Sequence, residues 1–147
     1  MSLLVPTVPY VSVTMSLIHS QLYQSGRFDE INMGKFTRDL VAQLAHMHRS
    51  DKNIRLKIVA ADIYLSVTQA IPTGLVINEI ISNAYKHAFE NKEKGDISIT
   101  LEDKMDQRIH LNIKDNGAGI SDHIDIDNAE TMGLKLTRGT FGDAHKL

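Results

Sequence analysis

The chain has 147 residues, of which 42% are hydrophobic and 23% charged, so it can bury the core of one domain and does not resemble a disordered polymer. Lys and Arg total 16 against 18 Asp and Glu; the formal charge of −2 argues against a nucleic-acid partner, which usually requires a basic excess. The absence of cysteine excludes disulfides, zinc–thiolate sites and cysteine nucleophiles. No apolar run approaches the roughly 20 residues that span a bilayer. We therefore expect a cytoplasmic chain without a membrane segment, although the parent protein is free to be membrane-anchored elsewhere.

Two helices and a strand are predicted in the first part of the chain. Apolar residues near helical spacing predict a helix over residues 11–24, and Gly26 follows its end. A second amphipathic pattern predicts a helix over about 35–48. Ile54, Leu56, Ile58 and Ala60 then alternate with Arg55, Lys57 and Val59, a pattern typical of a strand.

The second part of the chain contains a long helix and a hairpin. Ser66 and Gln69 have the spacing of a capping box and open a helical stretch that reaches Phe89. Alternation over 97–101 and 109–113, on either side of a polar turn, predicts an antiparallel hairpin with one buried face. A glycine-rich polar loop and a short helix near 132–136 follow. Helices segregated beside such a sheet predict an α+β fold, a two-layer α/β sandwich with a mixed, mostly antiparallel sheet.

The long helix carries a stripe of polar side chains opposite its apolar arc. On a helical wheel, the members of this stripe are Glu79, Ser82, Asn83, Lys86 and His87. A solvated face would explain a polar stripe, but such faces are usually rich in Lys and Glu rather than Asn and Ser. The amide oxygen of Asn83 suits Mg²⁺, the carboxylate of Glu79 can orient water or take a proton, and Lys86 suits phosphate oxygens. The stripe therefore indicates a magnesium–phosphate site, with an ordinary wet face as the alternative.

A second motif, Asp115-Asn116-Gly117-Ala118-Gly119-Ile120, follows the last strand of the predicted hairpin. Such a sequence makes a good turn. It also suits a base-binding loop, because Asp115 can accept a hydrogen bond from an exocyclic amine while the two glycines let the backbone approach the ring. The dinucleotide-binding glycine pattern and the P-loop ending are both absent.

Together, the two motifs resemble the ATP-binding domain of two-component sensor histidine kinases, in the superfamily shared with gyrase, the ninety-kilodalton heat-shock chaperone and mismatch-repair proteins. Residues 78–89, NEIISNAYKHAF, are similar to the N box of that family. Residues 115–120 are similar to its first glycine box, and residues 132–136, MGLKL, to a reduced second glycine box. Segments 17–24 and 70–75 resemble the subgroup whose phosphoacceptor helix carries a His-Arg-x-x-Asn type motif.

This resemblance implies the Bergerat-type ATP-binding fold, bound ATP and Mg²⁺, and a role for each matching position. Asn83 would be the metal ligand, Glu79 would be catalytic beside the γ-phosphate, and Asp115 would bind the adenine amino group. Residues 121–131 would form a mobile lid, and Gly133 would start a short helix whose backbone N–H groups face the phosphates. The implied nucleotide-binding residues are Asn83, Lys86, His87, Asp115, Gly117, Gly119, Ile120, Gly133 and Leu134.

The sequence departs from the family pattern at three places. Thr131 stands where the first glycine of the second box is expected, which would weaken closure over the phosphates. Gly139-Thr140 follows that box almost at once, so we expect the C-terminal part of the domain to be truncated, with missing residues or an unusually small sheet as the alternatives. The phosphoacceptor motif is absent, because His19 lacks the expected arginine and asparagine neighbours. We therefore expect residues 1–28 to be a remnant of the dimerisation and phosphoacceptor helical region, and 29–147 to be the ATP-binding domain.

The resemblance implies the catalytic part of a sensor histidine kinase, which transfers the γ-phosphate of ATP to a histidine in two-component signal transduction. Its partner would be the receiver domain of a response regulator, its parent protein would be a homodimer, and this fragment would not autophosphorylate. One alternative is a serine protein kinase of the anti-sigma-factor type. Another is a non-enzymatic interaction module with a degenerate nucleotide pocket, although the presence of Glu79, Asn83 and Asp115 argues against it.

Overall fold

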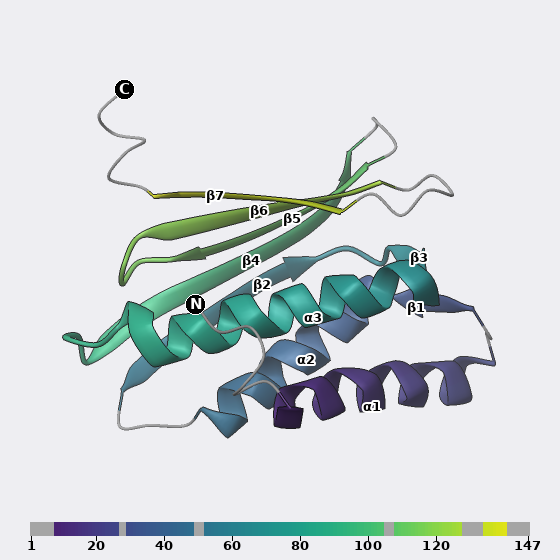
Figure 1. The fold of residues 1–147 in the computed structure, drawn as a ribbon, viewed down its shortest axis with the longest axis horizontal. Coiled ribbons are helices and arrows are strands. Elements are labelled where there is room, and N and C mark those ends of the chain that lie inside the picture. Colours follow the sequence, from purple (N-terminus) through teal and green to yellow (C-terminus); the bar gives the residue numbers. More distant parts are fainter. Residues whose placement is uncertain (1–7, 27–28, 49–51, 105–107, 128–133, 141–147) are drawn as a thin grey trace.

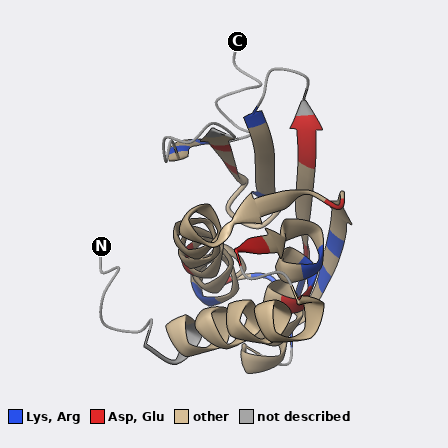
Figure 2. Ribbon diagram, turned by 90° about the vertical axis from the view of Figure 1, so that its right-hand side faces the viewer, with Lys and Arg blue, Asp and Glu red and all other residues tan. Residues whose placement is uncertain are grey.

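The computed structural model of the protein describes residues 8–26, 29–48, 52–104, 108–127 and 134–140. Within these ranges, a layer of helices covers one face of a five-stranded sheet (Figure 1), and the side view in Figure 2 shows the same two layers. The helices are α1 (Val8–Ser25), α2 (Met33–Met47) and α3 (Val67–Asn83), and α3 continues into a π-helical segment, η1 (Ala84–Ala88). The strands are β1 (Glu30–Asn32), β2 (Asn53–Ala60), β3 (Tyr64–Ser66), β4 (Lys94–Lys104), β5 (Arg108–Asp115), β6 (Ile120–Asp127) and β7 (Leu134–Thr140).

Side-chain caps fix where two of the helices begin. The side chain of Asn32 accepts a hydrogen bond from the Lys35 backbone N–H at the start of α2. At the start of α3, the Ser66 hydroxyl accepts one from the Gln69 N–H at 3.3 Å, so the predicted cap is confirmed. Each cap satisfies a backbone N–H that would otherwise have no partner within the helix.

Helix α1 packs on both α2 and α3. Its Ile18 is part of the main core, and a β-carbon at Gly74 of α3 would lie 2.7 Å from the ring of Phe36 and 2.9 Å from the Thr14 methyl group. This close packing places α1 in the same hydrophobic core as α2 and α3. Of the helices in the described ranges, none is long and apolar enough to cross a membrane.

The large sheet has the strand order β2-β4-β5-β6-β7, parallel between β2 and β4 and antiparallel elsewhere. Alternate residues of its central strands point toward the helices and are buried, and these are Ile97, Ile99, Leu101, Ile109, Leu111, Ile113, Ile124 and Ile126. The predicted two-layer α+β fold, its mixed sheet and the β4–β5 hairpin are therefore confirmed.

Two predictions for the C-terminal part were wrong. The expected mobile lid over 121–131 begins with strand β6, because Ile120, Ile124 and Ile126 alternate toward the core and pair the segment with β5. The expected short helix near 132–136 is replaced from Leu134 onward by strand β7, which pairs antiparallel with β6. Residues 128–133, including Gly133, lie outside the described ranges.

Candidate functional site

A cavity of about 450 Å³ lies between the C-terminal half of the long helix and the β5–β7 part of the sheet. The helical wall is formed by α3 and η1, and the opposite wall by β5, the loop after it, β6 and β7. Its volume falls within the ~300–1,000 Å³ typical of small-molecule sites. The lining residues are Glu79, Ile80, Asn83, Ala84, Lys86, His87, Ala88, Ile113, Asp115, Ala118, Ile120, Asp122 and Arg138.

On the helical wall, two polar side chains one turn apart are joined by a hydrogen bond. The amide nitrogen of Asn83 donates to Glu79 Oε2 at 2.9 Å. This bond uses the amide nitrogen of Asn83, so its carbonyl oxygen is the atom suited to a hard cation. The pair therefore offers a carboxylate and an amide oxygen to the same cavity.

The helix changes form directly after Asn83, where η1 begins. Single π-helical turns often occur at functional sites, because they alter the direction in which the following side chains point. Lys86 and His87 both line the cavity from this segment, and His87 Nδ1 also lies 3.3 Å from Glu90 Oε1. One member of the predicted stripe was wrong: Ser82 is only 3% exposed and does not line the cavity. A helical wheel placed it at the edge of the stripe, but a wheel does not show that this edge of α3 packs against the core.

The loop after β5 is held by the carboxylate of Asp115, which is 6% exposed. Its Oδ1 accepts hydrogen bonds from the backbone N–H groups of Gly117 and Gly119, both at 3.0 Å. These bonds orient the carboxylate through Oδ1, so Oδ2 is the atom suited to a further donor. Gly119 has φ = +76°, a left-handed conformation that favours glycine at this position.

The same loop is fastened to the end of the helix. A β-carbon at Gly117 would lie 2.1 Å from the Ala88 carbonyl oxygen, so the two backbones pack closely here. Lys92 Nζ donates to the carbonyl oxygens of Asn116 and Gly117, at 3.3 and 3.1 Å. The side chain of Asn116 also bonds the backbone N–H of Asp96 on β4 at 2.7 Å. The loop and the helical wall are thus held in a fixed relation.

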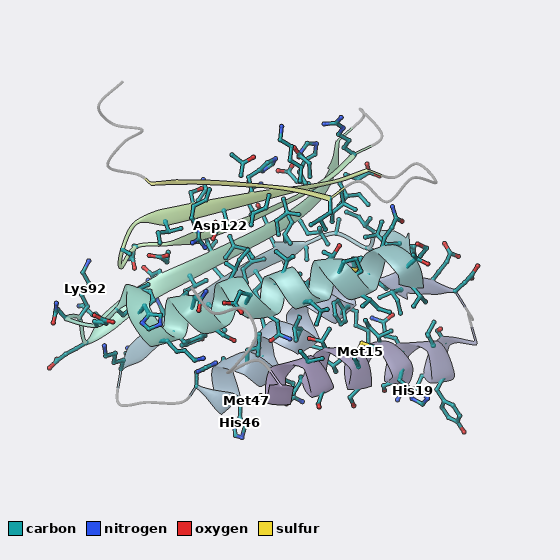
Figure 3. All side chains as sticks on the ribbon, viewed as in Figure 1. Met15, His19, His46, Met47, Lys92 and Asp122 are labelled. Atoms are coloured by element: carbon teal, nitrogen blue, oxygen red, sulfur yellow. The ribbon has the colours of Figure 1, made fainter. Side chains whose placement is uncertain are left out.

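Two charged residues of the sheet wall were not predicted. Ile113, Asp122 and Arg138 lie opposite one another on β5, β6 and β7. The carboxylate of Asp122 is 2% exposed and makes a bidentate pair with Arg138, with Nε to Oδ1 at 2.7 Å and a second bond at 3.1 Å. Figure 3 labels Asp122 on its strand. The hydrogen bond to Asp122 is the main cause that raises the pKa of Arg138, so this cation stays charged.

The sequence contained a signal for one of these two residues. Asp122 stands in the row of alternating residues that otherwise contains Ile120, Ile124 and Ile126, and an acidic residue in such a row is unusual. No comparable signal marked Arg138, because it lies on the edge strand β7, next to residues 132–136, for which we expected a short helix.

A stacked pair of rings joins η1 to the end of α2. The rings of His48, at the end of α2, and Tyr85 are stacked, with centroids 5.6 Å apart and an interplanar angle of 4°. Burial, and then the positive charge of Lys86, lower the pKa of His48, while burial raises the pKa of Tyr85. Both rings are therefore neutral at pH 7, and their stacking steadies the segment that carries Lys86.

The structure brings most of the predicted site residues to one cavity. Those that line it are Glu79, Asn83, Lys86, His87, Asp115 and Ile120. Gly117 and Gly119 shape the adjoining loop. Leu134 begins β7 and is not among the lining residues. The donors present are two hard oxygens on one helical turn and a nearby lysine, which fit a magnesium–phosphate group, and a loop carboxylate that fits an amino group.

Two known families match this chain. Residues 68–144 match the family described as histidine kinase-, DNA gyrase B-, and HSP90-like ATPase, and residues 12–48 match one described as histidine kinase. Blue-light-activated histidine kinase 2 of Erythrobacter litoralis is 25% identical over 85 residues, which are 58% of this chain and 25% of that protein. The anti-sigma F factor of Bacillus licheniformis is 43% identical over 49 residues, 32% of each chain. The 12–48 match crosses the boundary expected at residue 28.

A comparison with solved structures finds a similar fold. The histidine kinase domain of the Erythrobacter litoralis blue-light activated histidine kinase superposes with a TM-score of 0.69 at 18% sequence identity, covering 77% of this chain and 54% of that one. The likeness supports the fold. The chain spans about a quarter of the length of the curated histidine kinase that it matches.

Proposed function

Because the chain belongs to the histidine kinase-, DNA gyrase B-, and HSP90-like ATPase family, we propose that it is the ATP-binding catalytic part of a sensor histidine kinase. In this proposal, it transfers the γ-phosphate of Mg-ATP to a histidine that lies outside the ATP-binding domain. The observation that carries the proposal is the convergence of Glu79, Asn83, Lys86 and Asp115 on one cavity.

Each of these side chains has a role that its position supports. Asp115 Oδ2 accepts a hydrogen bond from the adenine amino group, since Oδ1 already accepts two hydrogen bonds from the loop. The Asn83 carbonyl oxygen would hold Mg²⁺, and the bound ion would neutralise phosphate charge. Lys86, and His87 beside it, contact phosphate oxygens. Ile120 packs against the base, and Gly119 gives its loop the left-handed turn.

Glu79 acts at the phosphate end of the cavity. Its carboxylate is held by the amide of Asn83 and can accept the proton of the attacking imidazole as the bond from nitrogen to the γ-phosphorus forms and the bond from that phosphorus to the β–γ bridging oxygen breaks. Positioning and charge neutralisation supply most of the rate enhancement in phosphoryl transfer. The Glu79–Asn83 pair contributes to both.

The proposal extends to the whole protein. We expect a cytoplasmic homodimer that passes the phosphate on to the receiver domain of a response regulator, as in two-component signalling. The phosphoacceptor motif is absent from these 147 residues, so this chain alone is expected to phosphorylate itself poorly.

Calorimetry with a non-hydrolysable ATP analogue, with and without Mg²⁺, tests nucleotide binding. Binding should depend on Mg²⁺ in the parent chain, lose that dependence in Asn83→Ala, and weaken strongly in Asp115→Ala. His19→Gln is the matched control, because His19 is exposed on α1, away from the cavity. Failure of the intact chain to bind at millimolar nucleotide would favour a non-enzymatic interaction module.

Transfer is tested by adding γ-labelled Mg-ATP and a helical segment that carries a receptive histidine. The proposal predicts label on that segment in an acid-labile form, because a phosphorus–nitrogen bond hydrolyses in acid. The 43% identity to an anti-sigma F factor over 49 residues favours one second candidate, a serine protein kinase. Acid-stable label that forms only on a serine of a partner protein would establish that alternative.

A further inference from the structure

A second cluster of polar side chains lies on the opposite face of the sheet from the cavity. His110 of β5 and Asp125 of β6 are directly opposite in register, and so are Asn112 and His123. Because side chains alternate along a strand, His123 points away from the face on which Asp122 lines the cavity. The cluster is therefore separate from the proposed nucleotide site.

The ligand atoms of three of these residues converge. His110 Nδ1 and His123 Nε2 each lie 2.6 Å from Asp125 Oδ1, and the two nitrogens are 3.3 Å apart. In the described part of the chain, this is the one group of three His, Cys, Asp or Glu side chains placed to hold a metal ion. The three side chains are 11%, 33% and 20% exposed, so the cluster is held by the sheet yet reachable from solvent.

From this geometry we propose that His110, His123 and Asp125 bind a divalent transition-metal ion, best represented by Zn²⁺. Two ligand atoms on adjacent corners of a tetrahedron with bonds of about 2.0–2.1 Å lie about 3.3–3.4 Å apart, which matches the distance between the two imidazole nitrogens. The Asp125 oxygen reaches the third corner when its distance to each imidazole nitrogen lengthens from 2.6 Å to about 3.3 Å. The fourth position is open to water or to another ligand.

The chemistry of the donors selects the metal. Imidazole nitrogen suits Zn²⁺, Ni²⁺ and Cu²⁺, whereas Mg²⁺ prefers oxygen ligands. The ion proposed here therefore differs from the one proposed at Asn83. His123 has an outer partner as well, since its Nδ1 lies 2.5 Å from Asn112 Oδ1. Partners of this kind hold the imidazole in the orientation that ligation requires.

The site joins β5 to β6 on the face of the sheet opposite the cavity. Ile113, Asp115, Ile120 and Asp122 line the cavity from these two strands or the loop between them. A bound ion would therefore stabilise the strand pair on which the sheet wall is built, and the midpoint of thermal unfolding should rise with the concentration of free Zn²⁺.

The test uses the full chain without a histidine tag, stripped of metal and titrated with Zn²⁺. We expect one equivalent to bind, and Co²⁺ in its place to give the visible absorption of a four-coordinate ion. His123→Gln and Asp125→Asn should each weaken Zn²⁺ binding by more than the ~10–100-fold expected for the outer partner variant Asn112→Ala. Asp125→Asn is the more telling variant, because its amide oxygen can still accept hydrogen bonds from both imidazoles.

Controls separate this site from surface histidines. His19→Gln and His46→Gln change exposed histidines on the helical side of the molecule, far from the sheet (Figure 3), and should leave Zn²⁺ affinity unchanged. Circular dichroism and binding of the ATP analogue check that each variant is folded. Absence of stoichiometric Zn²⁺ binding, or equal binding by the parent chain, His123→Gln and Asp125→Asn, would overturn the proposal.

Discussion

Replacing Gly117 by alanine should separate the two walls of the cavity without removing any of the side chains proposed to bind nucleotide. The new methyl carbon would lie 2.1 Å from the Ala88 carbonyl oxygen and 2.7 Å from its carbonyl carbon. Ordinary carbon–oxygen contacts are about 3.3 Å or longer, so the loop or η1 must shift by roughly 1 Å. Both neighbours are backbone atoms, which cannot rotate away as a side chain would.

The shift acts on nucleotide affinity because Asp115 and Lys86 are carried by the two parts that must separate. Losing the hydrogen bond between the Asp115 carboxylate and the base would remove about 1.5–3 kcal/mol, so we expect the dissociation constant for the Mg-bound ATP analogue to rise by about 10- to 100-fold. Overpacking should also lower the free energy of unfolding by about 1–3 kcal/mol. Calorimetric titration and urea denaturation measure the two effects.

Gly139→Ala is the matched control for this experiment. A β-carbon at Gly139 meets nothing within 4 Å, so both affinity and stability should stay close to those of the parent chain. If Gly117→Ala binds the ATP analogue as tightly as Gly139→Ala does, the two walls do not act together on one ligand and the reasoning fails.

Three further predictions concern charged or titratable groups in the site or next to it. Glu79→Gln keeps a hydrogen-bond acceptor for the Asn83 amide, so nucleotide affinity should change little while the rate of phosphoryl transfer falls by about 100-fold or more. An unchanged transfer rate in a single-turnover assay would show that Glu79 takes no part in the reaction. Arg138→Met removes the partner of the buried Asp122 and should lower the free energy of unfolding by about 1–3 kcal/mol. The control Arg55→Met breaks an exposed ion pair and should lower it by less than about 1 kcal/mol. Equal losses for the two variants in urea denaturation would contradict this prediction. Since the pKa of His48 is lowered in the folded state, the unfolded chain binds a proton at His48 more readily than the folded chain does. The free energy of unfolding should therefore fall as the pH drops through 6.5 toward the lowered pKa, and it should fall less steeply in His48→Gln. An identical pH profile for the two chains would refute the lowered pKa of His48.

The parts of the fold that follow from local pattern could be predicted from the sequence. The α3 cap at Ser66 and the β4–β5 hairpin depend on residue types at short spacing, and both are present. Strand β6 was missed because its inward row contains Asp122, and the glycine-rich motif before it resembled the start of a loop. Strand β7 gains its structure from pairing with β6, a long-range interaction that local periodicity does not report.

The candidate site shows the same division. Glu79 and Asn83 could be placed together because they are one α-helical turn apart. Their meeting with Asp115 could not be derived from spacing, since 32 or more residues and a hairpin separate them, and it rested on the resemblance to a known family. Ser82 was misplaced, because burial against the core overrides the hydroxyl's preference for water. The His110–His123–Asp125 cluster required the β5–β6 register, which no sequence pattern supplied.

Hydrogen exchange of the backbone amides, measured with and without the Mg-bound ATP analogue, tests the central claim most directly. A single nucleotide held by both walls should slow exchange in two separate segments, residues 79–88 and 115–122, at the same nucleotide concentration. Saturation with nucleotide that protects only one of these segments, or neither, would contradict the account.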